Sequence, residues 1–491
     1  MTEYLLYAAL GCFAIFAAIA LPAAIIGVTH LLRQHQTGYL HLGVYGILLI
    51  SAIKTLFSNR VLANNSVTPD ATPLGGLHPI PAWGQRAVSV FLIIMALERI
   101  IHYLQQHKSV LGPAPLLTLA YIGFWFGTVA SPMFFGEIPT FAHERFYTLL
   151  IGWGALCLNK HESDLTIIAA RNGLFLTMIG GYMVAPINPS FVFDLTYSQG
   201  LIPGLPRFAG LAPHPVFLGM LTQMALFSLW VQPFARSWLN RCAWGIGFLT
   251  LFLAQSKTAW VSFIPCALTM FVCIHGRQLL KRMTDSRYPE FGISILISVC
   301  GLMILVGSLL LFGDLDAKLD HFFNSDEGAQ ITSLTGRDKI WAVAFAEWHR
   351  NPVFGYGLNL FDEDFRAMIG MSAATHGHNQ FIDVLARSGL IGAISLIIYA
   401  LALLVYALCY AISSQGLSIT LFLALALRSV SEVPMTLHGY GVEFVGHMML
   451  LIVIAGQTQQ QKHSTKPVKS MIYHPANCAA QDEIFSDYPA I

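Results

Sequence analysis

The chain has 491 residues, of which 55% are hydrophobic and only 11% are charged, and its formal net charge is +1. Soluble domains carry roughly 25% charged residues, so this composition excludes an ordinary soluble protein. The near-zero net charge also excludes the strongly basic surface of nucleic-acid-binding proteins. Apolar runs of roughly 20 residues, each long enough to cross a bilayer, recur along the chain. They predict an all-α polytopic membrane helix bundle.

The apolar runs predict about 12 or 13 transmembrane helices in a single transmembrane domain, residues 1–456. The first run has neither a basic n-region nor a small-residue exit, so a retained span is expected rather than a cleaved signal peptide. Residues 457–491 are polar without apolar periodicity and predict a disordered tail. The predicted spans are 4–26, 38–57, 85–104, 114–133, 143–159, 165–185, 213–232, 242–256, 258–275, 292–312, 383–411, 417–432 and 442–456.

Lysine and arginine residues collect on one side of the predicted bundle. They are frequent in the loops 233–241 and 276–291 and in the tail, and threading the spans brings these segments to the same side. Because cytoplasmic loops are enriched in Lys and Arg, that side and the C-terminus are predicted to be cytoplasmic. The loops 58–84, 186–212 and 313–380 then fall on the external face.

The polar loop 313–380 stands out beside so many apolar runs, and loops of this length commonly carry function. It is predicted to contain a helix, because Thr335 and Asp338 form a shortened capping box and apolar residues follow at helical spacing. Asn351-Pro352 is predicted to end that helix.

Arg337 lies in the first turn of this predicted helix. Free N–H groups and the helix dipole attract anions at that position, and the planar guanidinium of arginine suits phosphate. A solvated arginine, or a local pair with Asp338, is the alternative interpretation.

Two histidines, His376 and His378, close the same loop. His378 stands just before the predicted start of a long helix, where the helix dipole favours a neutral imidazole that can accept a proton. His376 is the competing base, but it lies farther from the helix start. The alternative for His378 is capping or packing at the membrane interface.

Two further cations belong to other external turns. Arg207 lies in a proline-rich loop, and Lys257 lies at a tight turn between two spans. Cations at the membrane are energetically costly, so both are functional candidates. For Lys257 the alternative is a side chain that extends to the membrane surface. Arg428 and Glu432 are spaced i,i+4 on one predicted helix and predict a structural ion pair.

The three cations and His378 are far apart in the sequence, but all map to the predicted external face. Together they predict a site for a large anionic substrate, such as a lipid with a diphosphate head group. The chain has no Walker A sequence, and Gly355-Tyr356-Gly357 lacks the third glycine of a dinucleotide loop, so a nucleotide site is not predicted. The cysteines have neither zinc nor haem spacing, so no metal or redox cofactor is predicted.

These residues stand in motifs that resemble the O-antigen ligase and polymerase superfamily of bacterial envelopes. The resemblance covers roughly residues 200–432. Lys257 stands where members often have arginine, and Pro215 where asparagine is common. The matching pieces are Arg207-Phe208-x-Gly210 with His214-Pro215 and Leu218-Gly219, Ser256-Lys257-Thr258, Thr335-Gly336-Arg337 with Trp341, Asn351-Pro352-x-x-Gly355-x-Gly357, His378-Asn379-x-x-x-x-x-Leu385 and Gly389-Leu390-x-Gly392.

The resemblance implies a metal-independent, inverting glycosyltransferase of the bacterial inner membrane that uses no cofactor. Its donor would be a glycan on undecaprenyl diphosphate, and its active site would face the periplasm. His378 would take the proton of the acceptor hydroxyl. Arg207, Lys257 and Arg337 would hold the diphosphate and stabilise charge on the leaving group. His376 is expected to contact the substrate.

Two enzymatic functions share this chemistry and differ in the acceptor. A ligase, the first choice, would transfer a finished glycan to lipid A-core or another terminal acceptor. A polymerase would join repeat units of exopolysaccharide or O-antigen. A transporter of lipid-linked glycans is the third hypothesis, but it predicts a repeated arrangement of broken helices that the sequence does not display. Besides the bilayer, other polysaccharide-assembly proteins are candidate partners.

Overall fold

The computed structural model describes residues 38–58, 60, 62, 79–107, 109–195, 204–284, parts of 287–304, 337–371 and 374–464. Within these residues the regular secondary structure is helical, apart from one antiparallel pair of two-residue strands. The elements are α2 (Leu40–Leu56), α3 (Pro79–His107), α4 (Pro115–Trp125), η1 (Phe126–Ala130), α5 (Ser131–Phe135), η2 (His143–Phe146), α6 (Tyr147–Leu156), α7 (Lys160–Val184), α8 (Pro189–Val192), β1 (Phe193–Asp194), β2 (Arg207–Phe208), α9 (Pro215–Val231), α10 (Ser237–Leu253), α11 (Lys257–Thr284), α15 (Arg337–Arg350), α16 (Glu363–Ile369), α17 (Gln380–Cys409), α18 (Leu417–Ser429) and α19 (Val442–Ser464).

Several of these helices have the length and composition of membrane spans. Among the described residues, six are long and apolar enough to cross a membrane, namely α3, the continuous stretch α4–α5, α7, α11, α17 and α19. Helices α2, α9 and α18 are apolar but shorter. The prediction of an all-α polytopic membrane protein is therefore confirmed.

The described helices follow the predicted spans closely, because each span was predicted from a continuous apolar run. The predicted span 4–26 and most of 292–312 lie outside the described residues. Helix α19 continues through Ser464 into the predicted polar tail, and the rest of that tail also lies outside the described residues. Gln457 and Thr458 in this extension are buried, at 4% and 6% exposed.

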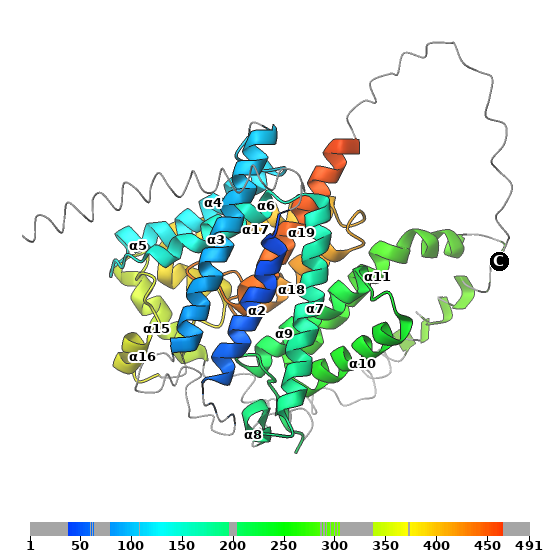
Figure 1. Ribbon diagram of the computed structural model, residues 1–491, viewed down its shortest axis with the longest axis horizontal. Coiled ribbons are helices and arrows are strands. Elements are labelled where there is room, and N and C mark those ends of the chain that lie inside the picture. The colour runs from blue at the N-terminus through cyan, green and yellow to red at the C-terminus, as the bar shows by residue number, and fades with distance from the viewer. Residues whose placement is uncertain are drawn as a thin grey trace, which may run out of the picture.

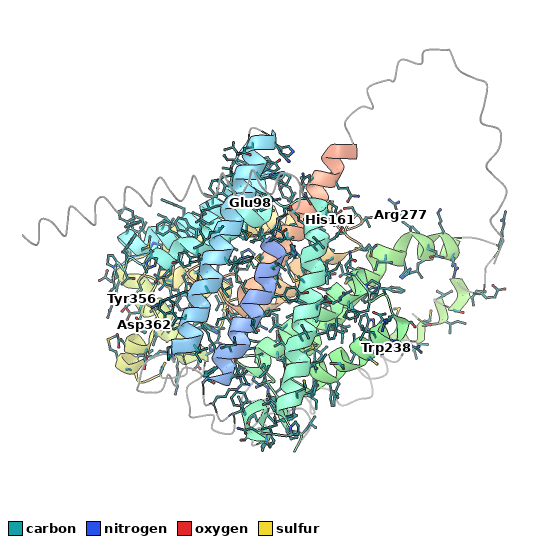
Figure 2. All side chains as sticks on the ribbon, viewed as in Figure 1. Glu98, His161, Trp238, Arg277, Tyr356 and Asp362 are labelled. Carbon is teal, nitrogen blue, oxygen red and sulfur yellow. The ribbon has the colours of Figure 1, made fainter. Side chains whose placement is uncertain are left out.

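The bundle is built from neighbouring helices that share one apolar core. Helix α7 packs against α2, α9 and α19, and α2 also packs against α3 (Figure 1). Large side chains such as Tyr121, Phe124 and Tyr399 are at most 1% exposed at its centre. Helices α15 and α16 lie at one side of the view, away from α10 and α11. In Figure 2, Tyr356 and Asp362 accordingly lie far from Arg277.

The loop helix α15 confirms the helix predicted in the long polar loop. It begins at Arg337 and ends at Arg350, just before Asn351-Pro352, as the motif predicted. Thr335 of the predicted capping box lies outside the described residues. A small second core joins this part of the loop to α17, and its buried members are Ala344, Tyr356, Leu360, Phe361, Phe365, Ala374 and Ala386.

Helix α17 is broken at Gly389, where the backbone is left-handed with φ 61° and ψ −160°. After the break, the loop supplies a hydrogen-bond acceptor to the helix, because the N–H of Leu390 donates to Pro352 O at 2.9 Å. Before the break, the loop is the donor, and the N–H of Tyr356 donates to Ala386 O at 2.9 Å. A Cβ at position 389 would lie 2.3 Å from Val353 O, so this close approach requires glycine. The glycine motifs of the sequence therefore make a joint between loop and helix.

Candidate active site

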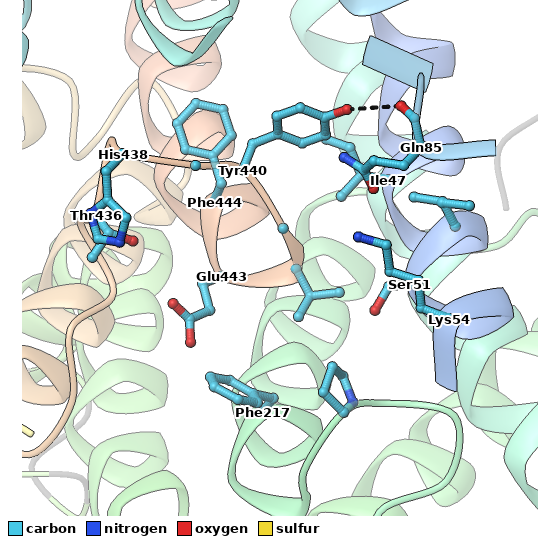
Figure 3. Close-up of a pocket in the computed structure, with 15 residues that line it drawn as sticks. Ile47, Ser51, Lys54, Gln85, Phe217, Thr436, His438, Tyr440, Glu443 and Phe444 are labelled. Atoms are coloured by element: carbon cyan, nitrogen blue, oxygen red, sulfur yellow. Dashed lines mark hydrogen bonds between the residues drawn. The ribbon is translucent and has the colours of Figure 1, made fainter. Parts of the chain in front are cut away.

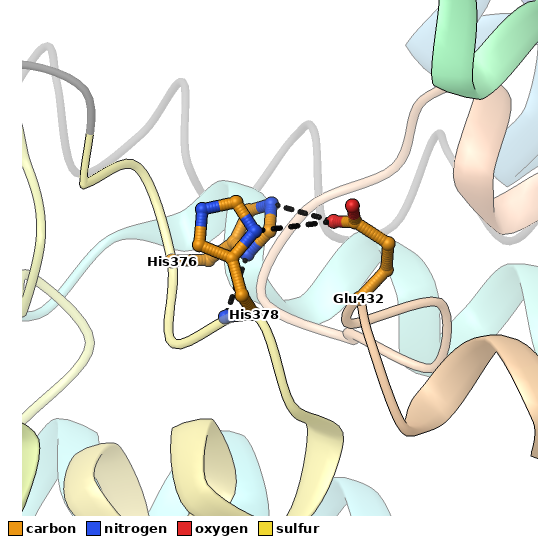
Figure 4. Close-up of side chains that lie close together, drawn as sticks. All are labelled: His376, His378 and Glu432. Atoms are coloured by element: carbon orange, nitrogen blue, oxygen red, sulfur yellow. Dashed lines mark hydrogen bonds and ion pairs between the residues drawn. The ribbon is translucent and has the colours of Figure 1, made fainter. Parts of the chain in front are cut away.

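Two histidines and a glutamate form a compact cluster at the N-terminal end of α17 (Figure 4). Nε2 of His376 lies 3.3 Å from Oε2 of Glu432, and Nδ1 of His378 lies 3.6 Å from the same oxygen. The His376, His378 and Glu432 side chains are 20%, 23% and 13% exposed. The cluster is thus mostly enclosed but remains open to a substrate.

The hydrogen bonds of the loop assign the proton of His376. Its Nδ1 accepts the backbone N–H of His378 at 3.1 Å, so a neutral His376 carries its proton on Nε2, which faces Glu432. Burial, followed by the charge of His378, lowers the pKa of His376 to about 4, against an opposing effect of Glu432. His376 is therefore neutral at physiological pH.

His378 is oriented by the same carboxylate through its other nitrogen. With Nδ1 directed to Glu432, the lone pair of a neutral His378 is on Nε2, which has no hydrogen-bond partner among the described residues. Figure 4 shows this second nitrogen on the ring side away from Glu432. The separation of 3.6 Å is longer than a normal hydrogen bond, as is common in catalytic pairs without substrate. This arrangement of carboxylate and imidazole is that of an oriented general base.

The histidine loop is held rigidly from both sides. The N–H of Gly377 donates to Oδ1 of Asp383 at 2.8 Å, and the indole N–H of Trp341 donates to Gly377 O at 2.8 Å. His378 itself has a left-handed backbone, with φ 47°. Non-glycine residues adopt this conformation at a cost of roughly 1–3 kcal/mol, and such residues cluster at active sites. Asp383 in turn pairs with Arg387 at 3.0 Å, so it is a structural acid beneath the site.

Glu432 is the site residue that the sequence did not identify. The predicted ion pair with Arg428 is wrong: within the described chain, the only side chains in ion-pair contact with Glu432 are the two histidines. The backbone keeps the i,i+4 spacing, because the N–H of Glu432 donates to Arg428 O at 2.8 Å, but the Glu432 carboxylate is turned to the histidines instead of the guanidinium. Burial raises the pKa of Glu432, but interactions with His378, His376 and Arg428 outweigh it and lower the pKa to about 2. The carboxylate is therefore ionised.

The turns that carry Arg207 and Lys257 lie against each other. Nε of Arg207 donates to Ala254 O at 3.0 Å, and Nε2 of Gln255 donates to Leu205 O at 2.7 Å. Arg207 is 9% exposed, and its cross-strand partner is Asp194. Lys257 is the first residue of α11 and is exposed.

The segment that carries Glu432 connects this pair of turns to the histidines. The hydroxyl oxygens of Thr258 and Ser431 are 3.3 Å apart, which joins the Lys257 turn to the residue before Glu432. Nδ2 of Asn379 donates to Val430 O at 3.2 Å, which joins the histidine loop to the same segment. The structure therefore brings the regions of Arg207, Lys257, His376 and His378 into one continuous neighbourhood.

Arg337 is connected to this neighbourhood only indirectly. It is the first residue of α15, one helical turn before Trp341, which contacts Gly377. Residues four apart share a helix face, so Arg337 belongs to the face of α15 turned to the histidine loop. It makes no side-chain hydrogen bond or ion pair among the described residues.

Two further residues complete the polar surroundings. His214 caps α9 by accepting the N–H of Val216 at 3.3 Å, and burial followed by the charge of Arg207 lowers the pKa of His214 to about 4. Arg60 donates to Phe191 O at 3.0 Å and to Ala212 O at 2.5 Å, so it fixes the loop before His214. His214 was noticed in the sequence only as part of a motif, and Arg60 has no distinguishing pattern.

The cluster also has the residue types of a metal site. The ligand atoms of His376, His378 and Glu432 all lie within 4.8 Å of one another. However, a histidine ligand donates its second ring N–H to an acceptor, whereas Nδ1 of His376 faces a backbone N–H. Nε2 therefore holds a proton and cannot ligate unless the loop rearranges. The observed hydrogen bonding fits a proton-transfer site better than a metal centre.

The segment that follows Glu432 in the chain lines a cavity of about 350 Å³ (Figure 3). It is enclosed by α2, the start of α3, the start of α9 and the segment 436–444. Its lining includes aromatic rings and polar groups, among them the carboxylate of Glu443. None of the predicted diphosphate-binding cations lines it.

Two comparisons with known proteins agree with the resemblance found in the sequence motifs. The family model described as O-antigen ligase matches residues 242–397. The exopolysaccharide production protein ExoQ of Rhizobium meliloti (strain 1021) is 25% identical over 308 residues, which cover 57% of this chain and 68% of that protein. Together with the motifs and the helical membrane fold, these matches support a relationship to the O-antigen ligase and polymerase superfamily.

Proposed function

We propose that this protein is a glycosyltransferase that moves a glycan from a polyprenyl diphosphate carrier to an acceptor hydroxyl. The observation that carries the proposal is the pairing of His378 with Glu432 beside the cationic turns of Arg207 and Lys257. A base next to cations is what an acceptor hydroxyl and a diphosphate leaving group require together.

In the proposed reaction, Nε2 of His378 takes the proton as the acceptor oxygen attacks the anomeric carbon. The bond from that carbon to the phosphate oxygen breaks, and undecaprenyl diphosphate leaves. Glu432 keeps the imidazole oriented and stabilises the imidazolium that forms. Arg207, Lys257 and Arg337 would balance the negative charge of the leaving group. A single displacement of this kind inverts the anomeric centre, and it proceeds without a metal.

The proposed site faces the periplasm of a bacterial inner membrane. The enrichment of Lys and Arg in the loops on the opposite side supports this orientation. A lipid-linked donor also suits this location, because ATP and nucleotide sugars are absent outside the cytoplasm. The C-terminal tail would then be cytoplasmic.

Transfer by purified protein tests the proposal. Wild-type protein in nanodiscs, given lipid-linked glycan and an acceptor, is expected to form product, whereas His378→Ala is expected to lose at least a hundredfold in rate. His349→Ala is the matched control, because His349 lies in the same loop and its contacts with Phe345 O and the Trp348 ring are both within its own helix. Transfer by His378→Ala at the wild-type rate would contradict the role of the base. Movement of the lipid-linked glycan across the membrane without transfer would favour the transporter.

The acceptor separates the two enzymatic alternatives. The family model carries the description O-antigen ligase, whereas the name of ExoQ refers to exopolysaccharide production, which favours a polymerase. In a knockout strain, loss of all long glycan would identify a polymerase. Long glycan that remains on the lipid carrier would identify a ligase.

A further inference from the structure

The cavity is lined partly by the C-terminal end of α2, the end of that helix that is predicted to be external. Ser51 and Lys54 line it from the last turns of α2, and Lys54 is exposed. The chain leaves α2 toward the loop 58–84, which is predicted to be external. A ligand in the aqueous phase on that side can therefore reach the cavity.

The chemistry of the lining suits a ligand rich in hydroxyl groups. Glu443 points into the cavity near Phe217 (Figure 3), and its carboxylate has no hydrogen-bond or ion-pair partner within the part of the chain that the structure describes. A carboxylate accepts up to four hydrogen bonds, and hydroxyl groups are suitable donors. Phe217, Tyr440 and Phe444 add aromatic rings that can cover the apolar face of a sugar.

The wall of the cavity that Tyr440 forms is held in place by hydrogen bonds to α3. The hydroxyl groups of Tyr440 and Ser89 are 2.5 Å apart, and the Tyr440 hydroxyl also lies 3.4 Å from Gln85 O. These contacts tie the segment before α19 to α3. A lining that keeps its shape without ligand loses little conformational entropy on binding.

The position of the cavity distinguishes between the two substrates of the proposed reaction. Ser431 contacts the turn of Lys257, whereas residues 436–441 of the same segment line the cavity. Along this segment, Glu432 comes between Ser431 at the cationic turn and the residues that line the cavity. A donor diphosphate at the turns leaves the cavity for the other reactant.

We propose that this cavity is the acceptor subsite and that Glu443 is its specificity-determining residue, which binds hydroxyl groups of the acceptor sugar. This inference rests on the proposed function for the identity of the acceptor. The binding of a sugar in the cavity does not depend on transfer and can be measured separately.

Binding of a fluorescent oligosaccharide of the strain's own repeat unit, measured by anisotropy in nanodiscs without donor, tests the subsite directly. Glu443→Gln keeps the side-chain shape and is expected to raise the Kd about tenfold, because it removes charge-assisted hydrogen bonds. Ser51→Trp fills the cavity and is expected to abolish binding. Leu49→Trp is the matched control, since Leu49 lies on the same helix but is 62% exposed outside the cavity.

Kinetics with both substrates provide the second readout. Glu443→Gln is expected to raise the acceptor KM about tenfold while the donor KM stays unchanged. Unchanged oligosaccharide binding in Ser51→Trp, or a raised donor KM alone in Glu443→Gln, would overturn the inference. If the wild type binds the oligosaccharide but transfers nothing from any lipid-linked donor, the proposed function fails and the subsite stands.

Discussion

The charged cluster around Arg99 and the one around Glu432, both among the described residues, differ in how completely their polar groups are paired. In the first, Arg99 contacts both Glu98 and Glu162, and all three side chains are at most 2% exposed. Glu162 also accepts the N–H groups of Gly38 and Asn159, at 2.5 and 3.0 Å. In the second, Glu432 holds two histidines that are 20% and 23% exposed.

The difference distinguishes a closed structural cluster from the cluster that we propose to be functional. A buried charge is tolerated when it is paired and hydrogen-bonded, and the Arg99 cluster meets that condition completely. The Glu432 cluster leaves Nε2 of His378 open and keeps a left-handed backbone at the same residue. An incompletely paired, strained group at the edge of a bundle is available to react, whereas the closed network only joins helices.

Removing the carboxylate of the open cluster is expected to have the largest effect. Glu432→Gln should lower kcat for glycan transfer about a hundredfold with little change in donor KM, because the base loses its orientation. Glu432→Asp should recover part of the rate. Glu347→Gln, which loses a pair with Arg350 at 3.0 Å on the loop helix, is the control and should keep normal kcat. A normal rate in Glu432→Gln would remove the functional distinction between the clusters.

Breaking the closed cluster should affect stability instead. Arg99→Ala leaves two glutamates buried without their cation, which typically costs about 3–5 kcal/mol. The free energy of unfolding in detergent is expected to fall by that order, measured by thermal or denaturant unfolding. Protein that remains folded should keep the wild-type KM for both substrates. A selective rise in either KM would show that this cluster also takes part in binding.

Acid should destabilise the protein through its neutral histidines. The pKa of His376 is lowered from 6.5 to about 4 by burial first, and that of His214 is likewise lowered to about 4. Between pH 6.5 and about pH 4, these histidines are protonated in the unfolded chain but not in the folded chain. The free energy of unfolding therefore falls as the pH decreases through this interval. The unfolding midpoint in detergent should decrease over this range. His376→Asn should make the decrease shallower, and an unchanged pH profile would contradict the assignment of a neutral His376.

The smallest predicted effect concerns the support of the histidine loop. Trp341→Phe removes the hydrogen bond from the indole to Gly377 O while keeping an aromatic ring. The loss of one such bond costs about 1 kcal/mol, which corresponds to roughly a fivefold fall in kcat if it acts on the site. Trp348→Phe is the control. The indole N–H of Trp348 donates to Pro352 O at 3.1 Å and makes no hydrogen bond to the histidine loop. Equal rates in both variants would show that the loop is held by Asp383 alone.

The sequence predicted the spans and the loop helix well, because apolar runs and helix-ending signals are local properties. The helix that starts at Arg337 and its end before Asn351-Pro352 both follow from residues a few positions apart, whereas the joint of the loop with Gly389 was not predicted. The pairing of His378 with Glu432, to which we assign the proposed catalysis, could not be predicted in the same way. Glu432 is 54 positions from His378, and its local spacing to Arg428 suggested a different partner. Only the fold of the segment after α18 turns that carboxylate to the histidines.

The break at Gly389 has a mechanical consequence for an enzyme in a bilayer. A transmembrane helix tilts when the thickness of the membrane changes, and a continuous helix would carry that tilt to its end. In α17 the stretch from Gln380 to Ser388 is separated from the span by the break and is hydrogen-bonded to the loop instead. The break thus gives the stretch that follows His378 a direction of its own, which we expect to weaken its coupling to the tilt of the span. Transfer rates should accordingly stay nearly constant across lipids of different chain length.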